Sequence, residues 1–222
     1  MVAYTVLPAQ DVREMKLAWK AGQKVILNLK FGERVNVEAW DKKEVYLKAT
    51  VSINGGELNE AHIMDSILTD QSITIEADLD ENMVGKSFCC NCDENGTSRY
   101  NIGKKDKCKW ICTEIDYTVF LPAGADLELE TISGDVKILN MKGAIDAKSV
   151  SGPVDVIIPK GQRVDVSLKS VMGRVSSDPD ITTLEDGLRP MLARKLKGKI
   201  NGGGKYVHLE SVTGDVTLKS LQ

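Results

Sequence analysis

The fold is decided by the stretch Thr131-Ile-Ser-Gly-Asp-Val-Lys-Ile138, which returns three times in the C-terminal half of the chain. The later copies begin at Ser149, Ser170 and Ser211. When the copies are aligned on their glycine, each has a hydroxyl residue three positions before it, a β-branched residue two positions before it and a valine two positions after it. In chain order these columns are Gly134, Gly152, Gly173 and Gly214; Thr131, Ser149, Ser170 and Ser211; Ile132, Val150, Val171 and Val212; and Val136, Val154, Val175 and Val216.

Each copy is predicted to form a strand, a glycine corner and a second strand. Apolar residues also stand seven and five positions before the glycine, as Leu127 and Leu129 do in the first copy. Alternating apolar positions are typical of a strand with one buried face. Glycine tolerates a positive φ, so it marks a sharp bend or bulge between two strands. The valine after the bend starts a strand whose side chain points inward.

The spacing of the copies predicts stacked rungs. The glycines are separated by 18 (134 to 152), 21 (152 to 173) and 41 (173 to 214) residues, and the last gap is about two periods. A period of about 20 residues in all-β sequence is typical of a solenoid in which each unit buries its face against its neighbours. The chain is therefore predicted to be all-β, with residues 1–222 forming a single-domain parallel β-solenoid whose four valines stack in one inward column.

The N-terminal half is predicted to contribute half-rungs to the same solenoid. Period-2 alternation runs through 15–19, 25–29, 35–37 and 45–51, with breaks about every 10 residues. Residues 72–79 and 113–121 are expected to be strands, and residues 57–70 either a short helix or an irregular strand. Two segments interrupt the pattern: a Cys-rich insertion at 85–112, and an insertion at 178–204 that is expected to form a loop or a short helix before returning to the last rung.

Composition excludes some classes of protein. Hydrophobic residues make up 42% of the chain and aromatic residues 5%, which suits a narrow aliphatic interior. The net charge is −3 and no basic stripe is present, so nucleic-acid binding is disfavoured. No apolar run reaches the ~20 residues of a membrane-spanning helix. The first residues do not resemble a signal peptide, so we expect either a cytoplasmic protein or an envelope protein whose leader is absent from this sequence.

The five cysteines carry the strongest chemical signal. Cys89 and Cys92 form one close pair and Cys108 and Cys112 another, with 15 residues between the pairs and Cys90 left over. This spacing is close to that of a four-thiolate zinc site formed by Cys89, Cys92, Cys108 and Cys112. Disulfides among the five cysteines are the favoured alternative if the protein is exported. In either case we expect one of the first three cysteines to be linked to one of the last two.

Other polar residues give weaker signals. Asp135 and Asp215 follow the corner glycine and could form a calcium ladder, but Pro153 and Arg174 occupy this position in the other copies, and turn chemistry explains aspartate there without a metal. The sequence contains only two histidines, His62 and His208, and His208 is expected to point outward. No nucleophile-elbow, P-loop or zinc-protease motif is found.

The ordered series of rungs resembles a bacterial family of proposed adhesins whose known structures are β-solenoids. The resemblance rests on Ser-Gly-Asp-Val at 133–136, Thr-Gly-Asp-Val at 213–216, Leu-Pro-Ala-Gly at 121–124 and Asn-Gly-Gly-Gly at 201–204. It covers residues 113–220 well and 13–80 loosely. It implies a protein of the cell envelope, periplasmic or extracellular, and no established molecular activity.

Three functions follow as hypotheses. The favoured one is a non-catalytic, adhesin-like envelope protein that binds a surface polymer or a protein partner and needs no cofactor apart from the zinc considered above. The second is a carbohydrate-active enzyme, a polysaccharide lyase or hydrolase, with Asp146, Asp155 and Asp165 lining one outer face. The third is a structural or assembly module in which the two insertions make the contacts. A fold alone does not confer activity, so the enzyme is the less favoured reading.

Overall fold

The structure is a computed structural model that describes residues 10–84, 98–101, 110–183 and 195–221. These residues form 17 strands joined into one continuous sheet, together with two short 3₁₀ helices and one α-helical turn. The prediction of an all-β protein is confirmed. Within the described ranges, no helix has the length and apolar character needed to cross a bilayer.

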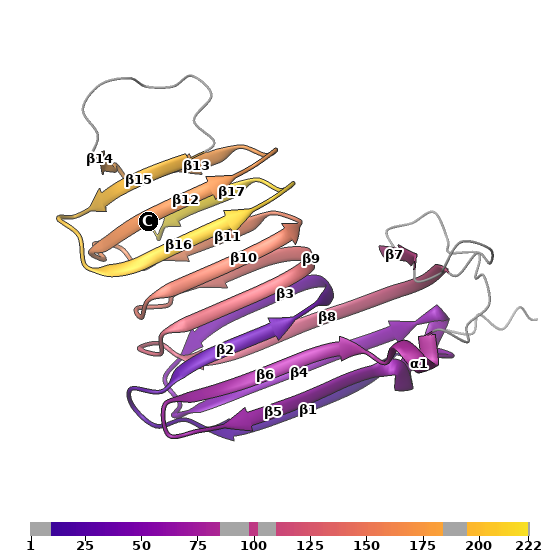
Figure 1. Ribbon diagram of the computed structural model, residues 1–222. Helices are drawn as coiled ribbons and strands as arrows, with labels where there is room; N and C mark the ends of the chain where they lie inside the picture. Colours follow the sequence, from indigo (N-terminus) through magenta and orange to yellow (C-terminus); the bar gives the residue numbers. More distant parts are fainter. Residues whose placement is uncertain (1–9, 85–97, 102–109, 184–194, 222) are drawn as a thin grey trace, which may run out of the picture.

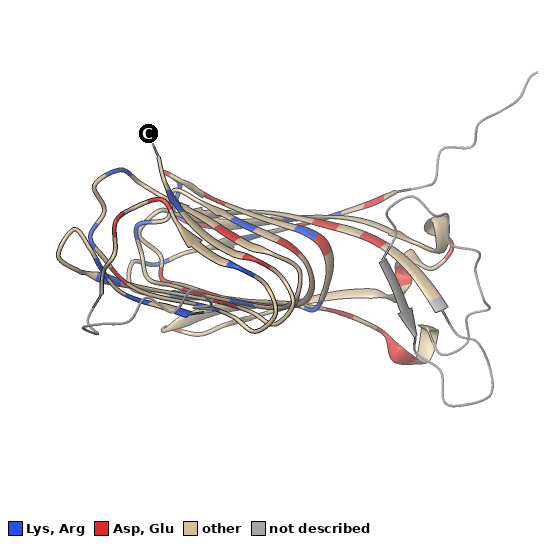
Figure 2. Cartoon of the chain, turned by 90° about the horizontal axis from the view of Figure 1, so that it is seen from above, with Lys and Arg blue, Asp and Glu red and all other residues tan. Residues whose placement is uncertain are grey.

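The sheet folds back on itself to make two layers with the core between them (Figures 1 and 2). We call them the front layer and the back layer, following the orientation of Figure 1. In spatial order, the front layer consists of β5 (His62–Leu68), β6 (Ser72–Leu79), β2 (Lys24–Leu29), the first half of β9 (Leu127–Leu139), β10 (Ile145–Ser151), β16 (Lys205–Ser211), β12 (Val164–Ser170), β15 (Lys195–Ile200) and β14 (Thr182–Thr183).

The back layer lies behind the front layer, and its strands follow the same spatial order, from the end that contains β5 to the end that contains β14. Its strands are β1 (Asp11–Ala18), β4 (Glu44–Ile53), β8 (Trp110–Pro122), β3 (Phe31–Trp40), the second half of β9, β11 (Val154–Ile158), β17 (Val216–Ser220) and β13 (Val175–Ser177). The remaining elements are η1 (Asn54–Gly56), η2 (Asn59–Ala61), α1 (Glu81–Val84) and β7 (Ser98–Asn101), which pairs with β8.

The repeat copies stack in parallel, as predicted. Strand β9 passes from the front layer to the back layer at Gly134, and the other copies make the same turn between β10 and β11, β16 and β17, and β12 and β13. Val136 pairs with Val154, Val154 with Val216, and Val216 with Val175. The column of four valines is therefore confirmed. Three of them are buried, whereas Val175, at the end of the column, is half-buried.

The order of the rungs differs from their order in the sequence. The fourth copy, β16 and β17, lies between the second and the third, because it pairs with β10 and β11 on one side and with β12 and β13 on the other. The 41-residue gap is therefore not a missing rung between the third and fourth copies. Residues within 178–204 instead contribute β14 and β15, which lie antiparallel at the end of the front layer.

The prediction of a parallel solenoid throughout is wrong for the outer strands. At the N-terminal end, β5 is antiparallel to β6, β4 to β8 and β1 to β4. Alternation of apolar residues gives each strand one buried face but is the same for both directions of pairing, so the sequence pattern could not separate them. The ambiguous residues 57–70 form η2 and β5, and Leu196, in the insertion expected to be a loop or a short helix, lies in strand β15.

Close backbone packing explains the corner glycines. A Cβ atom on Gly152 would lie 2.3 Å from the carbonyl oxygen of Gly134, and one on Gly214 would lie 2.0 Å from that of Gly152. Gly152 also has a φ of +121°, as the sequence predicted for a corner. In the first rung, Gly32 and Glu33 together lie opposite Gly134, and this extra residue shifts the register between β3 and β9.

The hydroxyl column completes the corners. Ser211 Oγ accepts a hydrogen bond from the Gly214 amide and donates one to the Gly152 carbonyl, both at 2.9 Å. Ser170 makes the same pair of bonds with Gly173 and Gly214. At these two corners a side-chain hydroxyl therefore replaces backbone hydrogen bonds that the bend interrupts, and it ties the corner to the next one in the stack.

Candidate functional site

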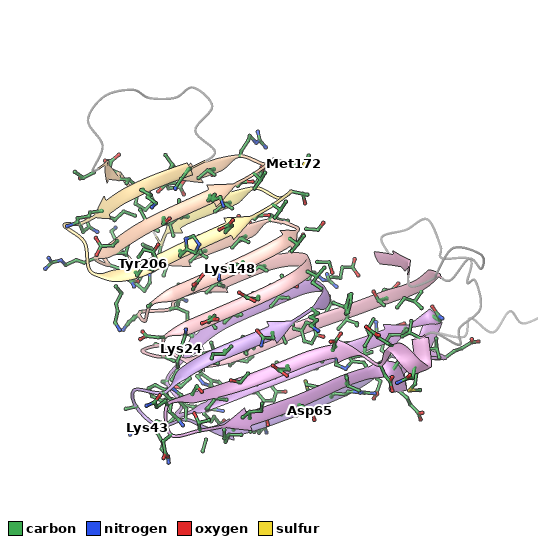
Figure 3. The ribbon with its side chains drawn as sticks, in the orientation of Figure 1. Lys24, Lys43, Asp65, Lys148, Met172 and Tyr206 are labelled. Carbon is green, nitrogen blue, oxygen red and sulfur yellow. The ribbon has the colours of Figure 1, made fainter. Side chains whose placement is uncertain are left out.

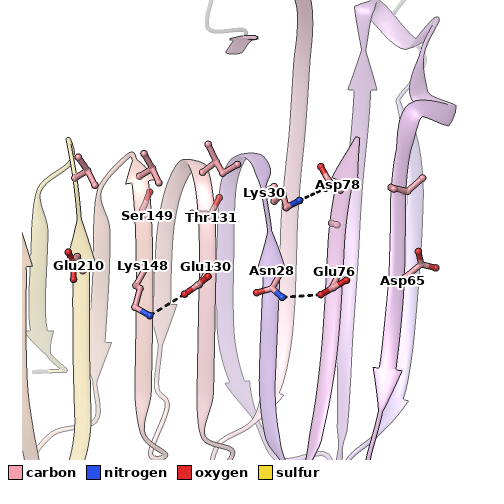
Figure 4. A pocket seen from close by; sticks show the side chains of 15 residues that line it. Asn28, Lys30, Asp65, Glu76, Asp78, Glu130, Thr131, Lys148, Ser149 and Glu210 are labelled. Atoms are coloured by element: carbon pink, nitrogen blue, oxygen red, sulfur yellow. Dashed lines mark hydrogen bonds and ion pairs between the residues drawn. The ribbon is translucent and has the colours of Figure 1, made fainter. Parts of the chain in front are cut away.

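The outward side chains of the front layer form rows that cross the strands (Figures 3 and 4). One row, here called the charged row, takes one polar residue from each of six neighbouring strands. From β5 to β16 its members are Asp65, Glu76, Asn28, Glu130, Lys148 and Glu210. Every member stands opposite the next in the strand register, so the row is continuous.

A second row lies two residues farther along the strands, nearer the glycine corners. Its apolar members, here called the aliphatic row, are Ile63, Ile132, Val150 and Val212, with exposed fractions of 44%, 41%, 50% and 36%. Three of these are the β-branched column of the repeat. Between Ile63 and Ile132 the row contains Asp78 of β6 and Lys30, the residue after β2, and these two form an ion pair.

The two rows line a groove of about 630 Å³ on the front layer (Figure 4). Five carboxylates and two lysines line it, so the groove is acidic. The buried Ser149 Oγ also belongs to its lining and is without a hydrogen-bond partner in the described part of the chain. The groove therefore combines an apolar side, near the corners, with a charged floor.

Most of the groove charges are already paired. Lys148 Nζ lies 3.1 Å from Glu130 Oε1, and this hydrogen bond raises the pKa of Lys148. The hydrogen bond with Asp78 raises the pKa of Lys30 in the same way. Glu210 is held by Lys169 of β12, which lowers the pKa of the Glu210 carboxyl. These lysines and carboxylates therefore form ion pairs in their charged states, which makes them poor proton donors or acceptors for a substrate.

The carboxylates predicted for an enzyme are not brought together. Asp146 lies on β10 and Asp165 on β12 in the front layer, with β16 between them, whereas Asp155 lies on β11 in the back layer. Asp146 is 3.8 Å from Lys148 Nζ, and Asp165 accepts a hydrogen bond from the Gly204 amide at 3.2 Å. The expectation that the three line one face is wrong, because the glycine corner moves Asp155 to the opposite layer.

Of the five cysteines, only Cys112 lies among the described residues. It is buried and disulfide-bonded, and its amide donates a hydrogen bond to the Asn54 side chain at 2.9 Å. Cys89, Cys90, Cys92 and Cys108 lie outside the described residues, so the partner of Cys112 stays a prediction, and a zinc site that includes Cys112 would require this disulfide to be reduced. No group of three or more potential metal ligands occurs in the part of the chain that the structure describes.

The aspartates considered for calcium have separate roles. Asp215 accepts hydrogen bonds from the backbone and the guanidinium of Arg174, at 2.8 to 3.2 Å, and they lower its pKa. Asp135 lies at another corner beside Glu33, whose pKa is raised by burial and by the Asp116 carboxylate. Turn and ion-pair chemistry therefore accounts for Asp215 without a metal.

The two histidines have different environments. His208 is outward, as predicted, but it is partly covered by stacking on Tyr206, with ring centroids 6.0 Å apart. His62 is buried, and its Nε2 is 2.9 Å from the hydroxyl of Tyr117. Burial, and then the nearby Arg13, lower the pKa of His62 to about 4. His62 is therefore a neutral core residue at neutral pH.

An aromatic cluster on the outer surface of the back layer is partly covered by lysines. Trp40, Phe120 and Tyr46 are stacked on one another, with Trp40 and Phe120 centroids 5.2 Å apart. Lys42 covers the Trp40 ring at 4.5 Å, and Lys16 covers the Tyr46 ring at 5.5 Å. Lysines therefore cover two of the three rings and compete with a sugar for these ring faces.

Sequence reasoning missed the aliphatic row, although its signal was present. Residues seven, five and three positions before the corner glycine all point inward, so strand parity places the residue two positions before it outward. A conspicuously aliphatic column at an outward position is the mark of the groove. Val171 continues the column on the next rung and is 42% exposed.

Comparison with known proteins supports the fold. The family model described as Toastrack DUF4097 matches residues 14–219. No curated protein matches the chain. Among solved structures, a proposed cell adhesion protein from Clostridium sporogenes aligns with a TM-score of 0.54 and 15% identity, covering 95% of this chain and 100% of that one.

Two further structures align over most of the chain but with low similarity. A proposed adhesin from Bacteroides fragilis has a TM-score of 0.32 and 9% identity, covering 96% of this chain and 99% of its own. A proposed lipid-binding protein from Parabacteroides distasonis has a TM-score of 0.24 and 8% identity, covering 96% and 97%. The Clostridium protein is similar in fold alone, and the resemblance to a bacterial family of proposed adhesins is confirmed.

Proposed function

The chain belongs to the Toastrack DUF4097 family, and from that premise we propose that it is a non-catalytic binding protein of the bacterial cell envelope. Its front layer presents the groove to a surface polymer or a protein partner. The similar structures carry the names of proposed adhesins, which fits a binding role without fixing the partner.

The observation that carries the proposal is the exposed aliphatic row. Its four side chains are 36% to 50% exposed and line one groove; Ile132, Val150 and Val212 are contiguous, and the Lys30–Asp78 ion pair separates them from Ile63. Single exposed apolar residues are ordinary on a protein surface, but a contiguous apolar patch rimmed by polar residues is typical of an interaction site. The core does not require these residues, because the inward positions of the same strands already fill it.

The state of the charges favours binding over catalysis. Lys148 neutralises Glu130, Lys169 of β12 neutralises Glu210, and Asp146, Asp155 and Asp165 do not converge. A glycosidase needs two carboxyl groups facing one another across a sugar, at a separation of about 5–10 Å. The polysaccharide-cleaving alternative therefore loses the residues on which it was based.

A binding assay with matched surface variants tests this function. Labelled protein is applied to a glycan array and to immobilised envelope proteins, and the double variant V150D/V212D is compared with E38Q/D155N, whose changes lie on the back layer. We expect the groove variant to lose the binding that wild type shows and the back-layer variant to keep it. Equal binding by all three proteins, or release of sugar fragments from a bound glycan, would contradict the proposal.

A further inference from the structure

The groove has one pair of charges that is not neutralised. Asp65 of β5 and Glu76 of β6 stand directly opposite each other in an antiparallel register. Like charges in this position repel each other. Glu76 accepts only a hydrogen bond from the Asn28 amide, at 3.3 Å, and within the described residues neither carboxylate has an ion pair with a lysine or arginine. This end of the groove therefore offers two carboxylates without an ion pair to a cationic ligand.

The aliphatic row sets the shape of the ligand that carries the cation. From β5 to β16 the rows cross six strands, a distance of about 24 Å at ~4.8 Å per strand. The charged row runs beside the aliphatic row at about 7 Å, the length of two residues along a strand. An α-helix of about 16 residues has the same length, and a stripe of basic residues beside its apolar stripe has a similar separation.

The lining selects against the other classes of envelope ligand. Five carboxylates and two lysines repel an anionic polymer. A neutral glycan would leave the carboxylate pair without a cation, and no aromatic ring lines the groove on which a sugar could stack. A polypeptide with basic and aliphatic side chains satisfies both rows at once.

We propose that the groove binds a basic amphipathic helix of a protein partner. Its aliphatic side chains lie on Ile132, Val150 and Val212, and a lysine or arginine lies between Asp65 and Glu76. This proposal rests on the proposed binding function and specifies the class of partner at the same groove.

The test uses the full chain and a fluorescein-labelled peptide of 18 residues. The peptide carries leucines at i, i+3, i+4 and i+7 spacing and lysines elsewhere; one control replaces the lysines by glutamate, and another scrambles the order so that no apolar face forms. Fluorescence anisotropy measures binding. We expect the lysine peptide to bind and both controls to bind at least ~10-fold more weakly, which corresponds to about 1.4 kcal/mol.

Protein variants identify the surface involved. D65N/E76Q is expected to weaken binding of the lysine peptide at least ~10-fold and to reduce its salt dependence, because the two carboxylates that attract the peptide are neutralised. V150S/V212S tests the aliphatic row and is expected to weaken it similarly, whereas E38Q/D155N, with the same change in charge on the back layer, leaves it unchanged. Circular dichroism confirms that each variant is folded.

Two results would overturn the proposal: failure of the lysine peptide to bind wild type, or equal binding to wild type and D65N/E76Q. If the array and envelope-protein assay still shows binding that V150D/V212D abolishes, only the class of partner is wrong and the binding function stands. If that binding is absent as well, both proposals fail.

Discussion

The two halves of the molecule make the same two-layered section by different means. In residues 127–220 the back strands are short, with five residues in β11 and in β17, and the glycine corners bring the rungs into backbone contact. In residues 11–122 the back strands are long, with 10 residues in β4 and 13 in β8, and β4 pairs antiparallel with both β1 and β8 instead of stacking in parallel. In the repeat half the close packing of the corners requires residues without a Cβ atom. The N-terminal half is packed with large side chains such as Tyr117 and Phe120.

The largest expected effect comes from adding one methyl group to a corner. Gly152→Ala should destabilise the protein by at least about 3 kcal/mol, because it combines a φ of +121° with a Cβ atom only 2.3 Å from a carbonyl oxygen. Urea unfolding measures the change. Gly22→Ala, with a φ of +93° and no atom within 4 Å, isolates the backbone strain and should cost about 1 kcal/mol.

Gly124→Ala is the control for both, since it has neither a left-handed φ nor a neighbour within 4 Å. It should change stability by less than about 0.5 kcal/mol. Equal losses at Gly152 and Gly22 would show that the close approach of the corners contributes nothing.

Acid should weaken the N-terminal half through His62. The folded protein holds the pKa of His62 at about 4, below its usual 6.5, so between these values the unfolded chain binds the proton more readily. This contribution to stability is complete above pH 6.5 and is lost as the pH falls to about 4. The difference amounts to about 3 kcal/mol.

Unfolding measured from pH 7 to 4 in wild type and in His62→Asn tests this dependence. The variant removes the titrating group and should flatten the curve between pH 6.5 and 4. An unchanged slope in His62→Asn would assign the acid sensitivity to other groups.

The aromatic stack should give a smaller loss. Phe120→Ala removes a ring that contacts both Trp40 and Tyr46 and is expected to cost about 2 kcal/mol, less than a fully buried phenylalanine because the site is half-buried. Glu38, which stands opposite Phe120 on β3 and is exposed, is the control. Glu38→Ala should leave the free energy of unfolding unchanged in the same urea titration. A similar loss of stability in both variants would show that the aromatic rings contribute nothing specific.

The smallest expected effect is the difference in stability between alanine variants of two corner serines. Ser211→Ala leaves the Gly214 amide and the Gly152 carbonyl without their partner and should cost about 1–2 kcal/mol. Ser149 occupies the same column, but its Oγ has no hydrogen-bond partner in the described part of the chain, so Ser149→Ala should be neutral or slightly stabilising. Equal effects would mean that the hydroxyl column does not act through these hydrogen bonds.

Sequence reasoning reached the corners because their chemistry is local. Glycine, the hydroxyl before it and the valine after it occur within six residues, and all four valines take the predicted column. The order of the rungs is not local: any copy can stack on any other, because their registers are the same. The positions of β16 and β17 depend on which stacking buries most surface, and the repeat does not encode that choice.

The candidate site was less predictable for a related reason. Asp65, Glu130 and Glu210 are far apart in sequence, and only the register of six strands aligns them. Their residue types are those of ordinary solvated strand faces. The aliphatic row could be found from strand parity, but its charged neighbours in β5 and β6 come from the half of the chain that lacks the repeat.

The position of the last copy has a consequence for how the protein is made. Among the described residues, β12 pairs with β15 and β16 and β13 with β17, so the third copy cannot take its final position until residues 205–220 exist. Until then β10 and β11 present an unpaired edge to the surrounding solution. A chain synthesised from its N-terminus therefore cannot add its rungs one by one as they emerge. The final stretch must enter between two earlier copies, and the time before it arrives is when the chain is most exposed to pairing with another molecule.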